Sequence, residues 1–375
     1  MLQDRGVRPA LVVLVTLVLG PIFAGCGISA PSGSGQADAA DGTTTPAAPA
    51  LAEADALSDP RAWDGPSTAV VPDAAVRPVE TDVTPQLPAT VTDAQGTKVT
   101  VTDASRILAL DVYGTLARTV FELGLGDRVV GRDVSTQFAE AAQLPLVTPT
   151  GHDLSAEAIL ELDPTVIITD TTLGPWDVVL QLRDSGIPVL VVDSHRGLDN
   201  LRQLTEQVAA ALGVPEQGQA LADRTDAEVA AVQAEVAGVA PAEEGRKLRM
   251  VFLYVRGQSG VYYMFGEGSG ADGLIDALGG YDVAQEIGWN GMKPVTDEGI
   301  IDAQPDLVLM MTKGLESAGG VDGLLERLPA LASTPAGEHR RFVDMEDSQI
   351  LGYGPLTADV LNALAVAVYA PGSVS

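Results

Sequence analysis

Several residue types are scarce in this chain of 375 residues, and their scarcity narrows what the protein can do. The single cysteine, Cys26, cannot form an internal disulfide. The 22 Lys and Arg are outnumbered by 51 Asp and Glu, so the formal net charge is −29 and the basic surface that nucleic-acid binding needs is missing. Because only 4% of the residues are aromatic and only three are histidine, an exposed Tyr or a loop His deserves a functional explanation.

Common signatures of catalysis are also missing from the sequence. There is no G-x-S-x-G, no H-E-x-x-H and no pair of cysteines, which argues against a hydrolase. A carrier of bare zinc or manganese would need more His, Asp or Glu around one point than the sequence can assemble. These observations favour a binding protein over an enzyme.

The N-terminus has the pattern of an export signal. Arg5 and Arg8 precede the apolar run ALVVLVTLVLGPIFAG, which is short for a membrane-spanning helix. Small residues then lead directly to Cys26 in FAGC, which resembles a bacterial lipoprotein signal; the alternative is an ordinary secretory signal with an incidental cysteine. We expect residues 1–25 to be removed and Cys26 to be acylated, so that lipid holds the protein on the extracytoplasmic face of the cell membrane.

Residues 26–88 are predicted to be a disordered tether. The stretch to about Pro60 is rich in Ala, Ser, Gly, Thr, Pro and Asp, and has too little apolar surface to fold. The following stretch to Pro88 stays rich in proline. We therefore expect ordered structure to begin at residue 89.

Residues 89–212 have the pattern of an α/β lobe. Alternating Val and Thr on either side of a Gly-containing turn predict a hairpin in ATVTDAQGTKVTVTD. Short apolar runs then alternate with helical segments, which indicates a parallel sheet with crossovers. The expected strands are 106–110, 129–131, 166–169 and 189–192, and the expected helices are 113–123, 155–162 and 176–184.

The alternation of strands and helices stops and later resumes. Residues 213–240, which begin with Pro215 as a helix starter, predict one long helix with an apolar stripe at Leu221, Val229, Val232 and Val236. Residues 241–372 return to α/β alternation. The sequence thus predicts a two-lobed α/β fold in which one long spacer helix joins the lobes across a cleft.

An internal repeat supports two related lobes. The segment EAILELDPTVIIT begins at Glu157, and EGIIDAQPDLVLM begins at Glu298. In each segment the glutamate is followed seven residues later by proline and then by an apolar strand. A helix–Pro–strand pattern can recur by chance, but its presence in both halves favours a duplicated unit.

Four segments together resemble a known family. They are VTDAQGTKVTVTDASRILAL, GHDLSAEAILELDPTVIITD, KPVTDEGIIDAQPDLVLM and GYGPLTADVLNAL. They resemble the substrate-binding lipoproteins of iron-chelate importers, and more narrowly the haem-binding proteins of actinobacterial haem ABC importers, over roughly residues 89 to 370. The resemblance implies a class III periplasmic-binding-protein-like fold, haem as the transported ligand, and an ABC permease with its ATPase as partner. It further implies a monomer that receives haem from upstream haem-binding surface proteins.

Two candidate iron ligands follow from this resemblance. Without the resemblance, the sequence indicates that His152 is an exposed histidine in a turn at the carboxyl edge of a sheet. It indicates that Tyr254 is a tyrosine near the end of a strand. The resemblance implies that they are the axial ligands of haem iron, one from each lobe, with Arg256 supporting the tyrosine. Residues two apart on a strand share a face, and a guanidinium together with ferric iron favours the phenolate.

The remaining assignments are weaker. Candidates to line the haem pocket are Tyr263, Met292 and Tyr353, each of which could equally belong to the core or the rim. His195, at the end of the strand VLVVD, is a further candidate. The acidic side chains at Glu157 and Glu298 suit the first turn of a helix, and the resemblance implies that they dock into arginine pockets of the permease. A carrier of ferric siderophore or cobalamin remains an alternative. A remote alternative is a dinucleotide-binding oxidoreductase, because Gly266, Gly268 and Ala271 form a G-x-G-x-x-A pattern.

Overall fold

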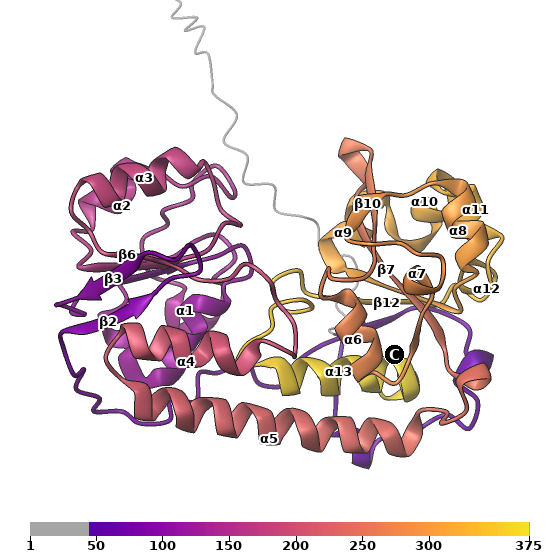
Figure 1. Ribbon diagram of the computed structural model, residues 1–375. Coiled ribbons are helices and arrows are strands. Elements are labelled where there is room, and N and C mark those ends of the chain that lie inside the picture. The colour runs from indigo at the N-terminus through magenta and orange to yellow at the C-terminus, as the bar shows by residue number, and fades with distance from the viewer. Residues whose placement is uncertain (1–44, 375) are drawn as a thin grey trace, which may run out of the picture. The chain divides into compact units, whose positions relative to one another are not determined.

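The computed structural model describes residues 45–374 (Figure 1). The predicted signal, Cys26 and the tether up to residue 44 lie outside the described residues. From Thr45 onwards the chain forms one compact unit, in which two α/β lobes each carry a sheet. Among residues 45–374 no helix has the length and apolar character needed to cross a membrane.

The N-terminal lobe is built on three parallel strands in the order β4-β5-β6. Each strand is an apolar run that is buried throughout, as expected for a parallel sheet covered on both faces. Alternate strand residues pack against α1 and α4 on one face and against α2 and α3 on the other. The elements of this lobe are β2 (Ala89–Thr92), β3 (Lys98–Val101), β4 (Ile107–Leu110), α1 (Thr115–Val120), α2 (Ala156–Glu161), β5 (Val166–Thr169), α3 (Trp176–Asp184), β6 (Val189–Val191) and α4 (Leu201–Ala211).

The C-terminal lobe carries a mixed sheet of seven strands, with the order β1-β12-β11-β7-β8-β10 and β9 paired to β7. One face packs on α6 and α13, and the other on the helices from α7 to α12. The elements are β7 (Arg249–Arg256), β8 (Val261–Phe265), α6 (Ala271–Ala277), β9 (Tyr281–Asp282), α7 (Val283–Glu286), β10 (Met292–Pro294), α8 (Asp297–Ala303), β11 (Leu307–Met311), α9 (Thr312–Ala318), α10 (Gly320–Arg327), α11 (Pro329–Ala332), α12 (Pro335–Glu338), β12 (Phe342–Met345) and α13 (Thr357–Tyr369).

The predicted spacer helix is α5 (Pro215–Val239), which begins at Pro215 as expected. It packs along α4 and α13 (Figure 1). Its apolar stripe serves both lobes, because Leu221 belongs to a core cluster of the N-terminal lobe whereas Val229 and Val236 belong to a core cluster of the C-terminal lobe. One rigid element therefore joins the two cores.

The prediction of a disordered tether as far as residue 88 is wrong for residues 45–88. Strand β1 (Ser67–Ala69) pairs in parallel with β12 at the edge of the larger sheet. Leu51 is 1% exposed, and its amide donates to Asn362 Oδ1 of α13 at 2.9 Å. Further along, the carbonyls of Ala74 and Ala75 accept hydrogen bonds from Arg118 of α1. This segment, named here the N-terminal strap (residues 45–88), therefore contacts both lobes, because β12, α13 and α1 supply the partners that its own composition lacks.

Because the strap is folded, a substitution of one of its buried residues should lower the stability of the protein, whereas the same substitution in a disordered tether should not. Leu51→Ala should lower the free energy of unfolding by about 2–5 kcal/mol, because it leaves a cavity under a buried side chain. Chemical denaturation of the purified protein measures this loss. The exposed neighbour Glu53 provides the control, and Glu53→Ala should change stability by less than ~0.5 kcal/mol. Equal stability of both variants would contradict the assignment of the strap to the fold.

Candidate functional site

The first predicted ligand, His152, lies on an exposed loop before α2. Gly151 has φ 100°, a conformation that favours glycine, with open space around it. The loop is fastened to the segment before α3, because the Gly174 amide donates to the His152 carbonyl at 3.3 Å and the Leu154 amide donates to the Gly174 carbonyl. Within residues 45–374 the imidazole makes no hydrogen bond or ion pair, so both of its nitrogens are available to a ligand.

The second predicted ligand, Tyr254, lies on an apolar face of the β7–β8–β10 sheet region. Tyr254 pairs directly with Tyr263 across β7 and β8, and its ring stacks on Phe265 with centroids 6.2 Å apart and an interplanar angle of 18°. Phe265 in turn pairs with Met292 of β10, which is 55% exposed. Paired residues in an antiparallel sheet share a face, so we name Tyr254, Tyr263, Phe265 and Met292 the aromatic face. The structure thus brings together three of the residues singled out in the sequence.

Arg256 lies on the same strand as Tyr254 and contacts it through the ring. Its guanidinium carbon is 4.5 Å from the centroid of the Tyr254 ring, which is a cation–π distance. The guanidinium also donates to Asp347 Oδ2 at 2.9 Å and to the Val255 carbonyl at 2.8 Å. No described residue hydrogen-bonds to the Tyr254 hydroxyl, so its oxygen is free for a ligand. Sequence reasoning identified Tyr254 and Arg256 but missed both Phe265 and Asp347.

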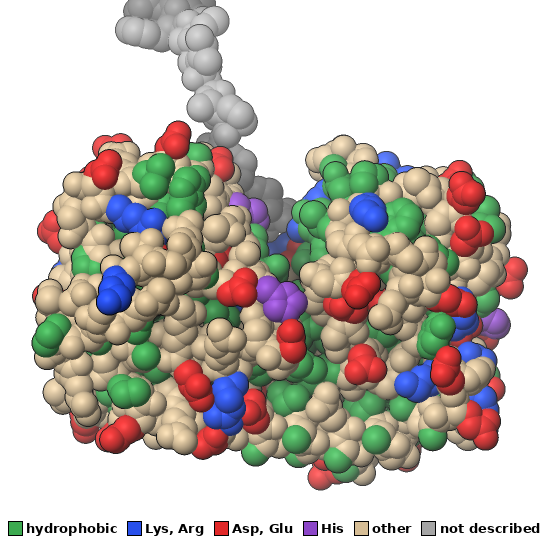
Figure 2. Space-filling view, in the orientation of Figure 1, with side chains coloured by type: hydrophobic (Ala, Val, Ile, Leu, Met, Phe, Trp, Pro, Cys, Tyr) green, Lys and Arg blue, Asp and Glu red, His purple; other side chains and the backbone are tan. Residues whose placement is uncertain are grey.

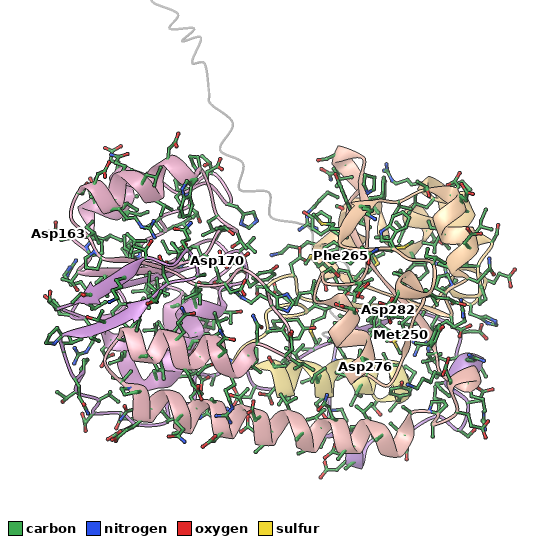
Figure 3. The ribbon with its side chains drawn as sticks, viewed as in Figure 1. Asp163, Asp170, Met250, Phe265, Asp276 and Asp282 are labelled. Carbon is green, nitrogen blue, oxygen red and sulfur yellow. The ribbon has the colours of Figure 1, made fainter. Side chains whose placement is uncertain are left out.

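The aromatic face borders the space between the two lobes. In Figure 3, Phe265 lies on the side of the C-terminal lobe that faces the N-terminal lobe, and Asp170 lies on the opposing side of the N-terminal lobe. The space-filling view is hollowed between the lobes (Figure 2). An apolar wall that carries one cation, and phenol oxygens without a partner among the described residues, suits a flat, largely apolar ligand that carries a metal.

A cavity of about 330 Å³ lies deeper between the lobes, and neither His152 nor Tyr254 lines it. Its walls include Tyr113, Thr115 and Tyr353. Two polar groups of these walls are engaged within the protein: Thr115 Oγ1 donates to the Gly352 carbonyl at 2.7 Å, and the Tyr353 hydroxyl donates to the Gly270 carbonyl. Burial raises the pKa of Tyr353, which is 4% exposed and has a structural role. We therefore place the candidate site at the aromatic face and the His152 loop.

The other two histidines have partners on the protein. His195 Nε2 lies 3.0 Å from Asp199 Oδ1, in the loop that follows β6. His339 lies on the surface, and its Nδ1 is 2.7 Å from Asp64 Oδ1. Of the three histidines, only His152 has a ring without a hydrogen-bond or ion-pair partner among residues 45–374.

A buried carboxylate cluster that sequence reasoning missed lies at the carboxyl edge of the smaller sheet. Asp111 follows β4, Asp170 follows β5, and Arg196 lies beyond β6. Arg196 Nη2 donates to Asp170 Oδ2 at 2.7 Å and to Asp111 Oδ2 at 3.2 Å, while Asp133 Oδ2 accepts from the Asp111 amide at 3.1 Å. The signal in the sequence was an aspartate directly after each of two apolar strands.

The single positive charge of one guanidinium cannot neutralise the charges of three buried carboxylates. Burial raises the pKa of Asp111 to about 7 and that of Asp133 to about 6, and it also raises the pKa of Asp170. The attraction of Arg196 opposes the shift at Asp111 and Asp170. Protons therefore bind this cluster in the folded protein at a pH where they have already left the unfolded chain.

This cluster makes the stability of the protein depend on pH. Between about pH 4, the ordinary range for aspartate, and pH 7 the folded state holds more protons than the unfolded state, so the contribution of Asp111 to stability falls as the pH rises. The stability of wild type relative to Asp111→Asn should therefore be greater at pH 5 than at pH 8. Denaturation at both pH values measures this difference, with the exposed Asp127→Asn as control. If the free energy of unfolding of Asp111→Asn differed from that of wild type by the same amount at both pH values, the assignment would be contradicted.

The two repeat glutamates occupy matching places in the structure. Glu157 lies in the first turn of α2, where Ser155 Oγ accepts from the Ala158 amide, and Glu298 lies in the first turn of α8, where Thr296 Oγ1 accepts from the Gly299 amide. Both glutamates are exposed, and neither makes an ion pair within residues 45–374. The helix caps are complete without them, which leaves both carboxylates free for a partner.

The G-x-G-x-x-A pattern does not form a dinucleotide site. Strand β8, which precedes it, runs antiparallel to β7 and β10, whereas a dinucleotide fold needs a parallel unit. The carboxylate of Asp272 accepts from the amides of Gly268 and Gly270 at 2.8 and 3.1 Å, which are the groups a pyrophosphate would need. The G-x-G-x-x-A pattern therefore gives no support to the remote alternative of an oxidoreductase.

Comparisons with known proteins agree with this geometry. The family model described as periplasmic binding protein matches residues 112–348. The uncharacterized ABC transporter substrate-binding lipoprotein YvrC of Bacillus subtilis (strain 168) is 23% identical over 287 residues, which cover 75% of this chain and 86% of that protein.

Solved structures of haem-binding proteins are also similar. The heme binding protein HmuT is 39% identical, with 83% of this chain and 99% of that chain covered and a TM-score of 0.78. The periplasmic heme-binding protein RhuT from Roseiflexus sp. RS-1 is 37% identical, with 73% of this chain and 100% of that chain covered and a TM-score of 0.65. The family model matches more than half of this chain, which shows that the chain belongs to the periplasmic binding protein family.

Proposed function

We propose that this protein binds haem between its lobes and delivers it to a membrane ABC permease. In this proposal His152 and Tyr254 are the axial ligands of the iron, and Arg256 supports Tyr254. The observation that carries the proposal is the aromatic face, on which the Tyr254 ring lies against the Arg256 guanidinium and stacks on Phe265 while its hydroxyl has no partner among the described residues. The unengaged imidazole of His152 offers the second ligand, from the other lobe.

The solved relatives support this choice of residues. HmuT, which its title describes as heme binding, has also been solved as variants in which a histidine, a tyrosine and an arginine are each replaced by alanine. The replaced tyrosine and arginine are two positions apart, which is also the spacing of Tyr254 and Arg256. His152 is the only one of the three histidines here whose ring has no partner within the described residues.

The two ligands have complementary chemistry. A neutral imidazole binds haem iron through a nitrogen, and a phenolate oxygen is a ligand of ferric haem in other proteins. The guanidinium carbon of Arg256 lies 4.5 Å from the centroid of the Tyr254 ring, so a positive charge accompanies this ligand. Phe265, Tyr263 and Met292 would pack against the apolar porphyrin. This arrangement should hold haem in the oxidised, ferric state.

Delivery of haem to the permease would use the lipid anchor and two exposed glutamates. Acylation at Cys26 would anchor the protein to the extracytoplasmic face of the membrane, where a permease with its ATPase is the partner of a substrate-binding lipoprotein. Glu157 and Glu298, exposed on equivalent helices of the two lobes, would dock on the permease. We further propose that the protein acts as a monomer, is not an enzyme, and accepts haem from upstream surface proteins.

Ligand titration tests the proposal. The purified protein is mixed separately with hemin, cobalamin and several ferric siderophores, and absorption spectra and tryptophan fluorescence are recorded. We expect a shifted Soret band and quenching with hemin alone. Tight binding of cobalamin or a siderophore with no response to hemin would replace the haem assignment by that of a related carrier.

A further inference from the structure

The N-terminal strap follows the spacer helix α5 from one end to the other. At one end the Arg61 guanidinium donates to the carbonyls of Gly245 and Lys247, which come after α5. At the other end the Gln86 amide donates to the carbonyl of Gly213, just before α5 begins, at 2.7 Å. The strap is therefore bonded to the chain at both ends of the helix that joins the lobes.

Between these two ends, side chains join the strap to α5 itself. Arg77 donates through both of its amino groups to the carboxylate of Glu228, at 3.1 and 3.0 Å. Arg224 Nη1 donates to the Arg77 carbonyl at 2.6 Å, and Gln217 Nε2 donates to Glu80 Oε2 at 2.8 Å. The partners on α5 come earlier in the sequence as the strap proceeds, so the two segments run antiparallel.

The strap also crosses from one lobe to the other. Its first part belongs to the C-terminal lobe, where β1 pairs with β12. Its later part is bound to the N-terminal lobe, where the Val79 amide donates to the Glu122 carbonyl at 2.8 Å. The Glu80 carbonyl approaches Gly124 so closely that a Cβ on that glycine would lie 2.0 Å from the oxygen. Among the described residues, the backbone thus passes between the lobes twice, once as the strap and once as α5.

A single connecting helix would leave two places where the lobes could turn. Hinges are short loop or helix-end segments that absorb changes in backbone angles. The strap is bonded to both such segments, at Gly213 and at 245–247, so rotation at either end would break its hydrogen bonds. One exposed ion pair resists such a rotation only weakly, but a turning lobe has to disrupt several of these contacts at once.

We propose that the strap fixes the angle between the lobes, and that the fixed angle retains haem by keeping the ligands of the two lobes at a constant spacing. The second part rests on the proposed function. When two linked groups hold one ligand, each keeps the ligand close to the other, and this advantage falls once their spacing varies. Without the strap, the lobes should therefore move relative to each other and release haem faster.

Cutting the strap tests its role in the folded protein. A specific protease site is inserted between Pro72 and Asp73, which are exposed and lie between the parts of the strap bound to the two lobes. Gln181→Cys on α3 and Glu326→Cys on α10 carry spin labels at exposed positions, and Cys26→Ser removes the native thiol. Pulsed electron paramagnetic resonance then measures the distance between the labels without haem. We expect one narrow distribution that broadens after cleavage, and an unchanged distribution would overturn the inference.

Two controls separate the strap from a general loosening of the protein. The same protease site between Gly319 and Gly320, in the turn that joins α9 to α10, leaves both connections between the lobes intact when it is cut. Arg77→Ala removes a strap side chain that is 44% exposed, whereas Arg202→Ala removes one that is 39% exposed and pairs α4 with α5 inside the N-terminal lobe. Only the strap cut and Arg77→Ala should broaden the distribution. Equal broadening after the control cut, or no difference between the two variants, would overturn the inference.

Haem release gives a second readout. Hemin-loaded protein is mixed with an excess of a haem-scavenging protein, and absorption follows the dissociation. Cutting the strap should speed dissociation about tenfold, because two linked contacts gain ~10²–10⁴-fold in avidity and only part of that gain should be lost. If cleavage broadened the distances but left the rate unchanged, the role of the strap in retaining haem would be wrong. If the uncut protein did not bind hemin, the proposed function would be wrong, while the distances would still decide whether the strap fixes the lobes.

Discussion

Replacing both candidate ligands, with His152→Ala and Tyr254→Phe in one chain, should abolish tight haem binding. Each change removes a direct bond to iron, and since loss of a residue that only supports a metal ligand typically costs ~10–100-fold in affinity, the double variant should lose more than that. Each single variant should bind more weakly than wild type and have a different Soret spectrum, because iron keeps one protein ligand. Hemin titration by absorption measures affinity and spectrum together.

Each ligand has a control residue of the same type. His339→Ala removes a histidine that pairs with Asp64 on the surface, and Tyr262→Phe removes a hydroxyl from the neighbouring strand position, whose side chain packs against the other face of the sheet. Both should bind hemin as wild type does. Phenylalanine is chosen at Tyr254 because it keeps the stacking on Phe265 and removes only the oxygen. Unchanged affinity and spectrum in the double variant would contradict the ligand assignment.

The second large effect concerns transport. Reversing both docking charges, with Glu157→Arg and Glu298→Arg, should abolish haem uptake by cells while leaving the affinity of the purified protein for hemin unchanged. Both glutamates are exposed and unpaired within the described residues, and a single first-turn charge affects helix stability by only about 0.3–1 kcal/mol, so the protein should still fold. On the permease, however, two arginines would replace two carboxylates and repel a basic docking surface.

A matched control is available on a neighbouring helix. Asp177 is also exposed and also lies in the first turn of a helix, α3, but it is outside the repeat. Asp177→Arg should therefore leave uptake near the wild-type rate. If the double glutamate variant lost hemin binding in solution, or if uptake continued unchanged, the docking role would be wrong.

Much of the fold was predictable because local patterns determined it. The strands predicted at 106–110 and 166–169 are β4 and β5, with β4 one residue shorter than expected, and the predicted helix 176–184 is α3. Runs that are buried on both faces need no information from distant residues to be recognised. The strand expected at 129–131 forms only an isolated bridge between Val129 and Ile107, because the chain turns away after one paired residue.

Other features depend on partners far away in the sequence. Residues 67–69 form β1 only because β12 offers a free edge, and nothing in Ser-Thr-Ala itself indicates a strand. In the candidate site, the spacing of Tyr254 and Arg256 placed them on one strand face, but the contact of Arg256 with Asp347 joins residues 91 positions apart. A single sequence shows which residue types stand at strand ends, but not which of them meet.

The central claim is that one iron is bound by an imidazole and a phenolate from separate lobes. The most direct measurement is a crystal structure of the protein loaded with ferric haem. The account predicts one iron coordinated by a ring nitrogen of His152 and by the phenolic oxygen of Tyr254, with the porphyrin against Phe265 and Met292. Haem bound with either side chain turned away from the iron, or seated in the deeper cavity beside Tyr353, would contradict it.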